Sequence, residues 1–210
     1  MYHGRIINTD ADVAAGLEWL GAADPRLVPA IAQCGSVPLR RRADGFSELL
    51  CIIVGQQVST AAAAAIWERM GAAGLITQEA VLEASDAALQ GAGLSRPKMR
   101  YARALAAAEI DFAALRDLPD DAVMARLTDV TGIGAWTAEI YAMFCLGRAD
   151  VFAPGDLALR EAARVLLALP GRPTPAEMAC LAQAWSPWRA VAARLLFAYY
   201  RVAKGREGLA

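Results

Sequence analysis

The sequence predicts an all-α protein, built as one domain or as two small lobes. Its 210 residues are 57% hydrophobic with alanine throughout, and Val, Ile and Thr rarely alternate with polar residues. Alanine has the highest helix propensity, whereas a strand with one buried face requires alternation. Stretches with helical spacing are also bounded by residues that begin and end helices. A chain of this length can bury a substantial core.

Helix signals run through the first half of the chain. Asp10 is predicted to cap a first helix, and Pro25 opens a second one that Gly35 ends. A strongly apolar stretch then forms a helix to about Val54, and after a break a further helix ends at Gly71. Thr77 and Ser85 are predicted to cap two short helices, and a further helix begins near Ser95 to Pro97.

The second half is predicted to be equally helical. Residues 119–129 and 135–147 form helices on either side of a Gly-Ile-Gly triplet. Three further helices follow, over residues 156–169, 174–184 and 187–204. The spacing of Thr174 and Glu177 is that of a capping box, in which each side chain accepts a bond from the other residue's amide. About ten helices are expected in all, with no strand and no solenoid repeat.

Composition and the N-terminal sequence argue against a membrane protein. No stretch of about 18 uncharged apolar residues occurs. The N-terminal sequence MYHGRIINTDAD lacks the apolar core of a signal peptide. We therefore expect a cytoplasmic protein.

The cysteines and the single histidine limit the chemistry that the chain can perform. The cysteines are far apart in apolar helical surroundings, so we expect reduced core residues and no zinc or iron–sulfur site: Cys34, Cys51, Cys145 and Cys180. His3, at the N-terminus, is unsuited to a nucleophile–histidine pair or a histidine metal site. Any catalysis must rest on carboxylates, amides or backbone groups, and no cofactor is required.

The stretch TDVTGIGAWTAE, residues 128–139, predicts a tight turn between two helices. Gly132 and Gly134 permit it, because glycine tolerates positive φ and has no Cβ to clash. The second helix then begins with unpaired amides of Gly134, Ala135 and Trp136, which form an anion site at the positive end of the helix dipole. A phosphate diester fits this site, so a chain of net charge −1 can still hold the DNA backbone. The alternative is an ordinary helix–helix connection.

Backbone carbonyls on the other side of the turn form a second candidate site. Those of Thr128, Val130 and Ile133 could gather a monovalent cation, sodium or potassium, that bridges to a phosphate. Apolar residues around the turn, including Leu127 and Ala138, are spaced to pack the two helices together. The whole string is therefore more specific than Gly-x-Gly alone.

The string LTDVTGIGAWTA resembles the helix–hairpin–helix of the DNA glycosylase superfamily, in which an aspartate follows some twenty residues downstream in a GPD-like element. Here that element is VFAPGDLALR, which contains Asp156. Three other stretches resemble the 3-methyladenine DNA glycosylase II branch: GFSELLCIIVGQQVS, GLSRPKMRYARALA and WSPWRAVAARLLFAYYR. The resemblance extends from about residue 10 to residue 203.

This resemblance implies a single glycosylase domain over residues 1–210, in the compact form without an N-terminal α/β domain. One lobe comprises residues 45–150 and includes the hairpin. The other comprises residues 10–44 and 151–205, and a cleft separates the two lobes. We expect a monomer that acts on double-stranded DNA containing alkylated bases.

Asp156 is implied to be the catalytic carboxylate. Because it precedes a helical pattern, a helix N-cap is the simpler interpretation, and the two roles are compatible. A helix N-terminus stabilises the ionised form of a carboxylate. Cleavage of an N-glycosidic bond builds positive charge on the sugar, which an ionised aspartate can stabilise while it orients the attacking water.

The activity implied is base excision of alkylated purines of the 3-methyladenine and 7-methylguanine type, after the base has been flipped out of the duplex. Strand-cutting members of the superfamily carry a lysine in the exit helix of the hairpin, and its amine forms a Schiff base with the sugar. Trp136 occupies that position here, so we predict a monofunctional enzyme that leaves an abasic site.

Three residues are implied to line the pocket for the flipped base. The ring of Trp136 suits a cationic base. Phe197 matches a position where this branch commonly has Trp, and Ile140 one where some relatives have Tyr, so we expect an open and less selective pocket. Trp185 and Trp188 are expected to belong to the core instead.

The stretch GQQVS matches the wedge loop of the family, which implies that Gln57 fills the vacated base stack with Gln56 beside it. Alternatively, both glutamines cap the end of the helix before Ser59. Arg96 and Lys98 fall before a helix start and are expected to contact phosphates. The residues expected to bind DNA are therefore Gly132, Gly134, Ala135, Trp136, Thr137, Gln56, Gln57, Ser59, Arg96 and Lys98.

Other functions remain open. A glycosylase for oxidised or mismatched bases is disfavoured by Trp136 and by the lack of a four-cysteine cluster. A non-catalytic helix–hairpin–helix module that binds DNA is disfavoured by Asp156 and by the extent of the resemblance. An all-α protein unrelated to nucleic acid would require every motif match to be a coincidence.

Overall fold

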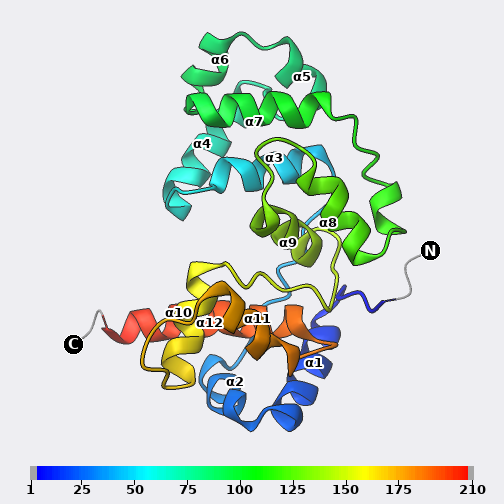
Figure 1. Cartoon of the computed structure of the whole chain (residues 1–210). Helices are drawn as coiled ribbons and strands as arrows, with labels where there is room; N and C mark the ends of the chain where they lie inside the picture. The colour runs from blue at the N-terminus through cyan, green and yellow to red at the C-terminus, as the bar shows by residue number, and fades with distance from the viewer. Residues whose placement is uncertain (1–3, 208–210) are drawn as a thin grey trace. The chain divides into compact units, whose positions relative to one another are not determined.

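The computed structural model describes residues 4–207, which contain helices and no strand (Figure 1). The α-helices of this part of the chain are α1 Asp10–Ala23, α2 Val28–Cys34, α3 Phe46–Gly55, α4 Thr60–Ala72, α5 Gln78–Glu83, α6 Asp86–Gly91, α7 Arg96–Ala107, α8 Asp120–Thr128, α9 Ala135–Phe144, α10 Leu157–Leu166, α11 Pro175–Gln183 and α12 Arg189–Glu207. Two 3-10 helices, η1 Pro25–Leu27 and η2 Ala114–Arg116, lie between them. An isolated antiparallel bridge joins Ile6 to Arg148. The all-α prediction is confirmed.

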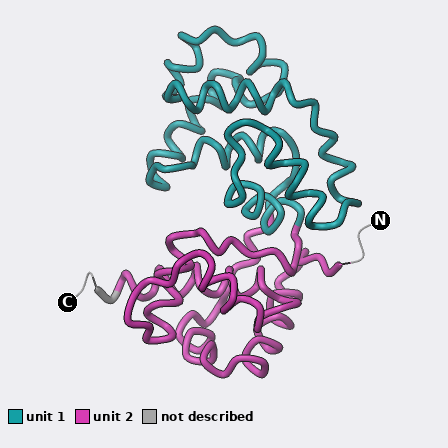
Figure 2. The backbone as a smooth tube through the Cα atoms, viewed as in Figure 1, with its two compact units in different colours: residues 1–2, 42–146 teal, residues 3–41, 147–210 magenta. Residues whose placement is uncertain are grey.

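The chain divides into two compact units (Figure 2). Unit 1 contains Arg42–Leu146 and carries α3 to α9. Unit 2 contains the described residues 4–41 and 147–207, which carry α1, α2 and α10 to α12. Unit 1 is thus a continuous run inserted between the two segments of unit 2.

Helix α3 is the central element of unit 1. Four of its residues are fully buried and Ile52 is nearly so; the four are Leu49, Leu50, Ile53 and Val54. A helix that is apolar on all sides must be surrounded by other elements. Accordingly, α4, α7 and α9 pack around α3 (Figure 1).

Helix α12 has the equivalent place in unit 2, where it packs against α1, α2 and α10. Gly16 allows α1 to approach closely, because a Cβ there would lie 2.7 Å from Cγ2 of Val191 and 2.9 Å from Cε3 of Trp188. Trp185 is fully buried and Trp188 is nearly so. The prediction that both tryptophans belong to the core is confirmed.

Several helix caps form where the sequence predicts them. The hydroxyls of Thr77 and Ser85 each accept a bond of 3.2 Å from the amide three residues on. At the start of α11, the Glu177 amide donates to the Thr174 hydroxyl at 3.2 Å, and the Thr174 amide donates to the Glu177 carboxylate at 2.7 Å. Gly35 ends α2 with φ of 60°. Each N-cap contributes about 1 kcal/mol.

The first helix begins differently from the prediction, because Thr9 and not Asp10 is its N-cap. Thr9 has extended backbone angles, and its hydroxyl accepts a bond of 3.2 Å from the Asp12 amide. The Asp12 carboxylate in turn accepts a bond of 2.9 Å from the Thr9 amide. This reciprocal pair leaves Asp10 in the first turn, where its charge favours the helix dipole.

Burial of the cysteines is uneven. Cys145 is buried, Cys34 and Cys51 are half-buried, Cys180 is exposed, and all four thiols are free. The prediction of core residues is therefore wrong for Cys180. Helix α11 buries Met178 and Ala182, and with 3.6 residues per turn the residue midway between them faces the other way.

Two sequence expectations concern the N-terminus and membranes. His3 lies outside the described residues. Among the helices of residues 4–207, none combines the length and apolar character needed to cross a bilayer.

A buried carboxylate links two segments of unit 2. Asp24, 4% exposed, accepts bonds of 2.7 and 2.8 Å from the Arg26 guanidinium and one of 3.0 Å from Trp185 Nε1. The guanidinium of Arg26 and, after it, the indole of Trp185 lower the pKa of Asp24, against the effect of burial. The ionised carboxylate therefore stabilises the fold.

Acidification should weaken unit 2 through Asp24. Since its pKa is lower in the folded chain, its contribution is fully present above the unfolded-state pKa of about 3.9 and is lost as the pH falls through the folded-state value. Asp24→Asn should lower the free energy of unfolding at pH 7 and flatten its fall between pH 7 and pH 3. Urea unfolding at both pH values measures this, and parallel pH dependences for the two proteins would contradict it.

Candidate functional site

The turn between α8 and α9 requires one of its two glycines for internal reasons. Gly132 adopts φ of +94°, a region that glycine reaches without strain. A Cβ at this position would lie 2.6 Å from the Cβ of Tyr101 on α7 and closer still to its ring. Both the backbone and the neighbouring helix therefore exclude a side chain at residue 132.

The other glycine of the triplet is under no such constraint. Gly134 is exposed and has φ of −91° and ψ of 175°, angles that any residue adopts. A Cβ there would meet no atom within 4 Å. The interpretation that both glycines serve the turn is therefore corrected for Gly134. Because Gly134 has no side chain, the N-terminal end of α9 is left uncovered.

Backbone amides lie at this uncovered end. Gly134 and Ala135 are exposed, and their amides have no acceptor within residues 4–207. They lie at the N-terminal end of the ten-residue helix α9, where the helix dipole adds partial positive charge. Free amides at the positive end of a helix dipole are suited to bind an anion such as a phosphate.

The next residues of α9 turn into unit 1. Trp136 and Ile140 are half-buried against its hydrophobic core, which leaves part of each side chain exposed. Thr137 is 2% exposed, and its hydroxyl accepts a bond of 2.9 Å from Nε2 of Gln56. The Thr137 side chain is thus engaged inside the unit and is not available to DNA, contrary to the prediction.

For Gln56 the alternative prediction, that it caps the end of the helix, is confirmed, because Gln56 is the C-cap of α3. Its Nε2 donates to the Gly132 carbonyl at 3.0 Å as well as to the Thr137 hydroxyl. Gln57, in contrast, is exposed and has φ of +57°. Ser59 caps α4 by accepting a bond of 3.2 Å from the Ala62 amide. Of the loop's predicted DNA contacts, Gln57 is the side chain that has no such internal bond in the described chain.

The two basic candidates differ in exposure. Arg96 is exposed at the start of α7. Lys98 is 9% exposed, and its Nζ donates to the Val54 carbonyl at 2.6 Å, at the C-terminal end of α3. Burial lowers the pKa of Lys98. The prediction that Lys98 contacts phosphates is corrected, because its ammonium group satisfies a helix end inside the unit.

The carbonyls proposed to hold a cation lie in the same turn. Thr128 is the last residue of α8, and Ile133 precedes the start of α9 by two residues. The Val130 carbonyl accepts a bond of 3.0 Å from the Ile133 amide, so one of the three oxygens already has a donor. Three carbonyl oxygens within six residues are still a suitable ligand type for a monovalent cation.

Asp156 is the N-cap of α10 in unit 2, which confirms the structural part of its predicted role. Its Oδ1 accepts bonds of 2.8 Å from the Ala158 amide and 3.1 Å from the Leu159 amide. The residue is 9% exposed. The two amide bonds therefore fix the orientation of the carboxylate, as is required of a group that must face a developing positive charge.

Phe197 of unit 2 has an occupied aromatic face. The guanidinium carbon of Arg40 lies 5.4 Å from the ring centroid, within the range of a cation–π contact. Arg40 is exposed and has φ of +53°. Sequence reasoning missed this partner, because nothing in the run of arginines at 40–42 indicates which one turns toward α12.

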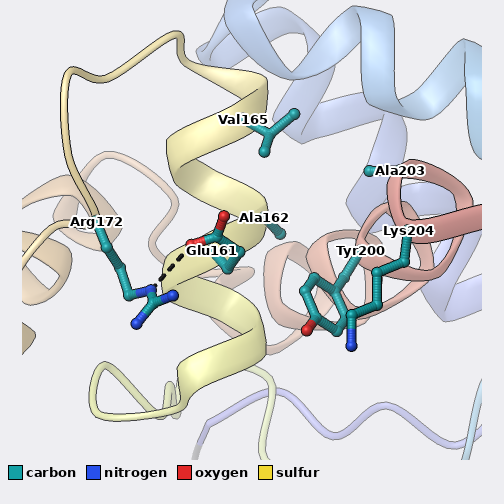
Figure 3. Close-up of a pocket in the computed structure, with 7 residues that line it drawn as sticks. All are labelled: Glu161, Ala162, Val165, Arg172, Tyr200, Ala203 and Lys204. Carbon is teal, nitrogen blue, oxygen red and sulfur yellow. Dashed lines mark hydrogen bonds and ion pairs between the residues drawn. The ribbon is translucent and has the colours of Figure 1, made fainter. Parts of the chain in front are cut away.

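A hollow of about 210 Å³ in unit 2 contains another carboxylate, Glu161 (Figure 3). Arg164 and Arg172 bind its two oxygens at 2.6 and 2.9 Å, and their hydrogen bonds lower its pKa. Tyr200 and Lys204 of α12 line the other side of the hollow. A carboxylate bound by two guanidinium groups is poorly suited to stabilise a cation, and no residue predicted for the site lines this hollow.

The predicted residues belong to both units. Unit 1 contains the hairpin, Gln57, Arg96, Trp136 and Ile140. Unit 2 contains Asp156 and Phe197. The predicted residues therefore fall into two separate groups: the turn before α9 in unit 1 and the helix-capping carboxylate in unit 2.

Comparison with known proteins identifies the family to which the chain is similar. The model of the HhH-GPD superfamily of base excision DNA repair proteins matches residues 50–188. The probable bifunctional transcriptional activator/DNA repair enzyme AlkA of Mycobacterium tuberculosis is 33% identical over an alignment 207 positions long, gaps included, which covers 92% of this chain and 41% of that protein. The chain therefore spans less than half the length of this relative.

Two solved structures are similar over nearly the whole chain. The 3-methyladenine DNA glycosylase Mag1 of Schizosaccharomyces pombe, in complex with abasic DNA, gives a TM-score of 0.80 at 25% identity and covers 90% of this chain and 97% of its own. The DNA-3-methyladenine glycosidase of Bacillus halodurans gives 0.76 at 32% identity and covers 96% of this chain and 94% of its own.

Proposed function

Because the chain belongs to the HhH-GPD superfamily of base excision DNA repair proteins, we propose that it is a DNA glycosylase that removes alkylated purines from double-stranded DNA. The observation that carries the proposal is Asp156, a carboxylate held by two backbone amides at the head of α10. The names of the similar proteins, two of which are 3-methyladenine glycosylases, support the choice of substrate.

In the proposed reaction the bond between C1′ of the sugar and the purine nitrogen breaks, and its electron pair leaves with the base. A purine alkylated at N3 or N7 is already cationic, so it departs as a neutral molecule. The positive charge that develops on the sugar is stabilised by Asp156. A water molecule then adds to C1′ and loses a proton, which leaves an abasic site.

DNA binding is proposed to depend on the hairpin. The exposed amides of Gly134 and Ala135 bind one phosphate, and Arg96 is available for another. Because few basic side chains pair with phosphates, the affinity for DNA should fall only weakly as the salt concentration rises. A sodium or potassium ion on the carbonyls of Thr128, Val130 and Ile133 would add one positive charge beside that phosphate.

The flipped base is proposed to meet Trp136, Ile140 and Phe197. The first two keep part of their surface exposed, and an aromatic face attracts a cationic base. At Phe197 such a base would compete with Arg40. Gln57, exposed on its loop, is the proposed filler of the vacated stack.

We expect the enzyme to leave the strand uncut. The chain has only two lysines. Lys98 is buried and bonded to the Val54 carbonyl, and Lys204 lies on α12 with its Nζ 5.2 Å from the ring of Tyr200. Borohydride added during the reaction should trap no covalent complex with DNA. A trapped complex would contradict the proposal, and Lys98→Met and Lys204→Met would identify its origin.

Base release decides between the proposed function and its alternatives. Duplex DNA treated with dimethyl sulfate should lose 3-methyladenine and 7-methylguanine, identified by chromatography, and should break only after alkali. Binding without release would indicate a non-catalytic DNA-binding module. Release confined to oxidised bases would indicate a different glycosylase. We further propose that the protein acts as a monomer in the cytoplasm, associated with the nucleoid when bound to DNA.

A further inference from the structure

Three contacts connect the hairpin, the loop after α3 and helix α7 within unit 1. Gln56 joins the loop to the hairpin. Lys98 of α7 donates to the Val54 carbonyl in the last turn of α3, directly before this loop. Tyr101, one helical turn further along α7, lies against Gly132 of the hairpin. The hairpin therefore contacts both the loop and α7, and α7 also contacts the end of α3 from which the loop leaves.

Gln56 is the connection that bridges the turn itself. Its side-chain amide has two hydrogens. One is donated to the Gly132 carbonyl within the turn, at 3.0 Å, and the other to the Thr137 hydroxyl in the first turn of α9, at 2.9 Å. Thr137 is almost fully buried. Removing the amide would leave a buried hydroxyl without this donor, so the bond is strongly favoured in the folded chain.

The residue that follows Gln56 is held in an unusual conformation. Gln57 has φ of +57°. This backbone angle is unfavourable for any residue with a Cβ, so it persists only where the surrounding structure imposes it. Those surroundings are the Lys98 bond to Val54 before it and the two Gln56 bonds. Gln57 itself remains exposed, as do Gly134 and Ala135.

We propose that Gln56 is a positioning residue, which fixes the spacing between the hairpin amides and the side chain of Gln57 so that both engage one duplex together. The inference rests on the proposed function, in which the amides bind a phosphate and residue 57 enters the vacated stack. Gln56 need not touch DNA. Its effect is to couple two events, the binding of a phosphate by the hairpin amides and the insertion of the Gln57 side chain into the base stack.

A double-mutant cycle tests the coupling. Gln56→Met, Gln57→Ala and the double variant are compared for affinity to a duplex with a tetrahydrofuran abasic analogue, and for fluorescence of a neighbouring 2-aminopurine, which reports disturbance of the stack. Gln57→Ala should abolish most of the fluorescence change with little loss of affinity. Gln56→Met should weaken affinity about tenfold and also reduce the fluorescence change. In the Gln56→Met background, Gln57→Ala should have almost no further effect.

Gln78→Met is the matched control. Gln78 is also half-buried in unit 1, and its Nε2 donates to the Ala106 carbonyl at 2.7 Å, away from the hairpin. This variant should lose similar stability and keep wild-type affinity and fluorescence. If Gln56→Met fails to fold, Thr137→Val removes one of the two acceptors, and Thr137→Ser should recover most of the loss.

The outcomes separate this inference from the proposed function. Additive effects of the two substitutions, or an unchanged Gln56→Met protein, would overturn the positioning role even if base release is normal. A wild-type chain that binds the abasic duplex but releases no base would overturn the catalytic proposal alone, and the cycle would still be read from binding and fluorescence. A wild-type chain that does not bind duplex DNA would overturn both.

Discussion

Asp156→Asn should reduce release of alkylated bases on the order of 10²–10³-fold or more, while the melting temperature stays close to that of the wild type. Asparagine has the same shape as aspartate and is an equally good N-cap. Its side-chain oxygen can therefore still accept the bonds from the Ala158 and Leu159 amides. What it lacks is the negative charge that the proposed reaction uses.

A second cap in the same unit separates the structural role of Asp156 from the chemical one. Thr174→Ala removes the N-cap of α11. This should lower stability by about 1 kcal/mol and the melting temperature by about 2–4 °C, with base release unchanged. Asp156→Ala should show both losses. Single-turnover release and thermal unfolding measure the two effects, and an Asp156→Asn protein with normal release would disprove the assignment.

Alanine in place of each hairpin glycine should give opposite phenotypes. Gly132→Ala introduces a Cβ against Tyr101 at a positive φ, so it should destabilise unit 1 by about 2 kcal/mol or more. Gly134→Ala introduces the same methyl group where no atom lies within 4 Å and the backbone is extended, so stability should not change. Its methyl group would instead stand in front of the amides and weaken DNA binding.

Urea unfolding and fluorescence anisotropy with a labelled duplex distinguish the two cases. Each variant serves as the control for the other, because the chemical change is identical. We expect about a tenfold loss of affinity for Gly134→Ala, which corresponds to about 1.4 kcal/mol. A Gly134→Ala chain with wild-type affinity would show that no phosphate approaches this end of α9.

Features governed by nearby residues were predictable from the sequence. The caps at Thr77, Ser85 and Thr174 involve partners three residues away, and they form as expected. The helix-capping position of Asp156 was predictable for the same reason. One cap was still misplaced by one residue. Thr9 and Asp10 in NTDAD are both residues that cap helices, and the N-cap is Thr9 and not Asp10.

Contacts between distant segments were not predictable. The sequence of GQQVS gives no sign that Gln56 bonds to Gly132 and Thr137, which are 76 and 81 positions away. Nor does the sequence show that the Lys98 ammonium group bonds to the Val54 carbonyl, 44 positions away. These partners are chosen by the packing of α3, α7 and α9, which no local pattern encodes. The two glycines of GIG likewise look identical in sequence and differ only through Tyr101 and the local φ.

The interrupted path of unit 2 bears on how the chain acquires its structure during synthesis. Unit 1 is a continuous run and can fold as soon as Leu146 has left the ribosome. The core of unit 2 requires α12 to pack on α1 and α2, which precede all of unit 1 in the chain. The ends of a long loop must therefore meet, which is entropically costly and slow. Until α12 has been synthesised, the apolar faces of α1 and α2 remain exposed to solvent.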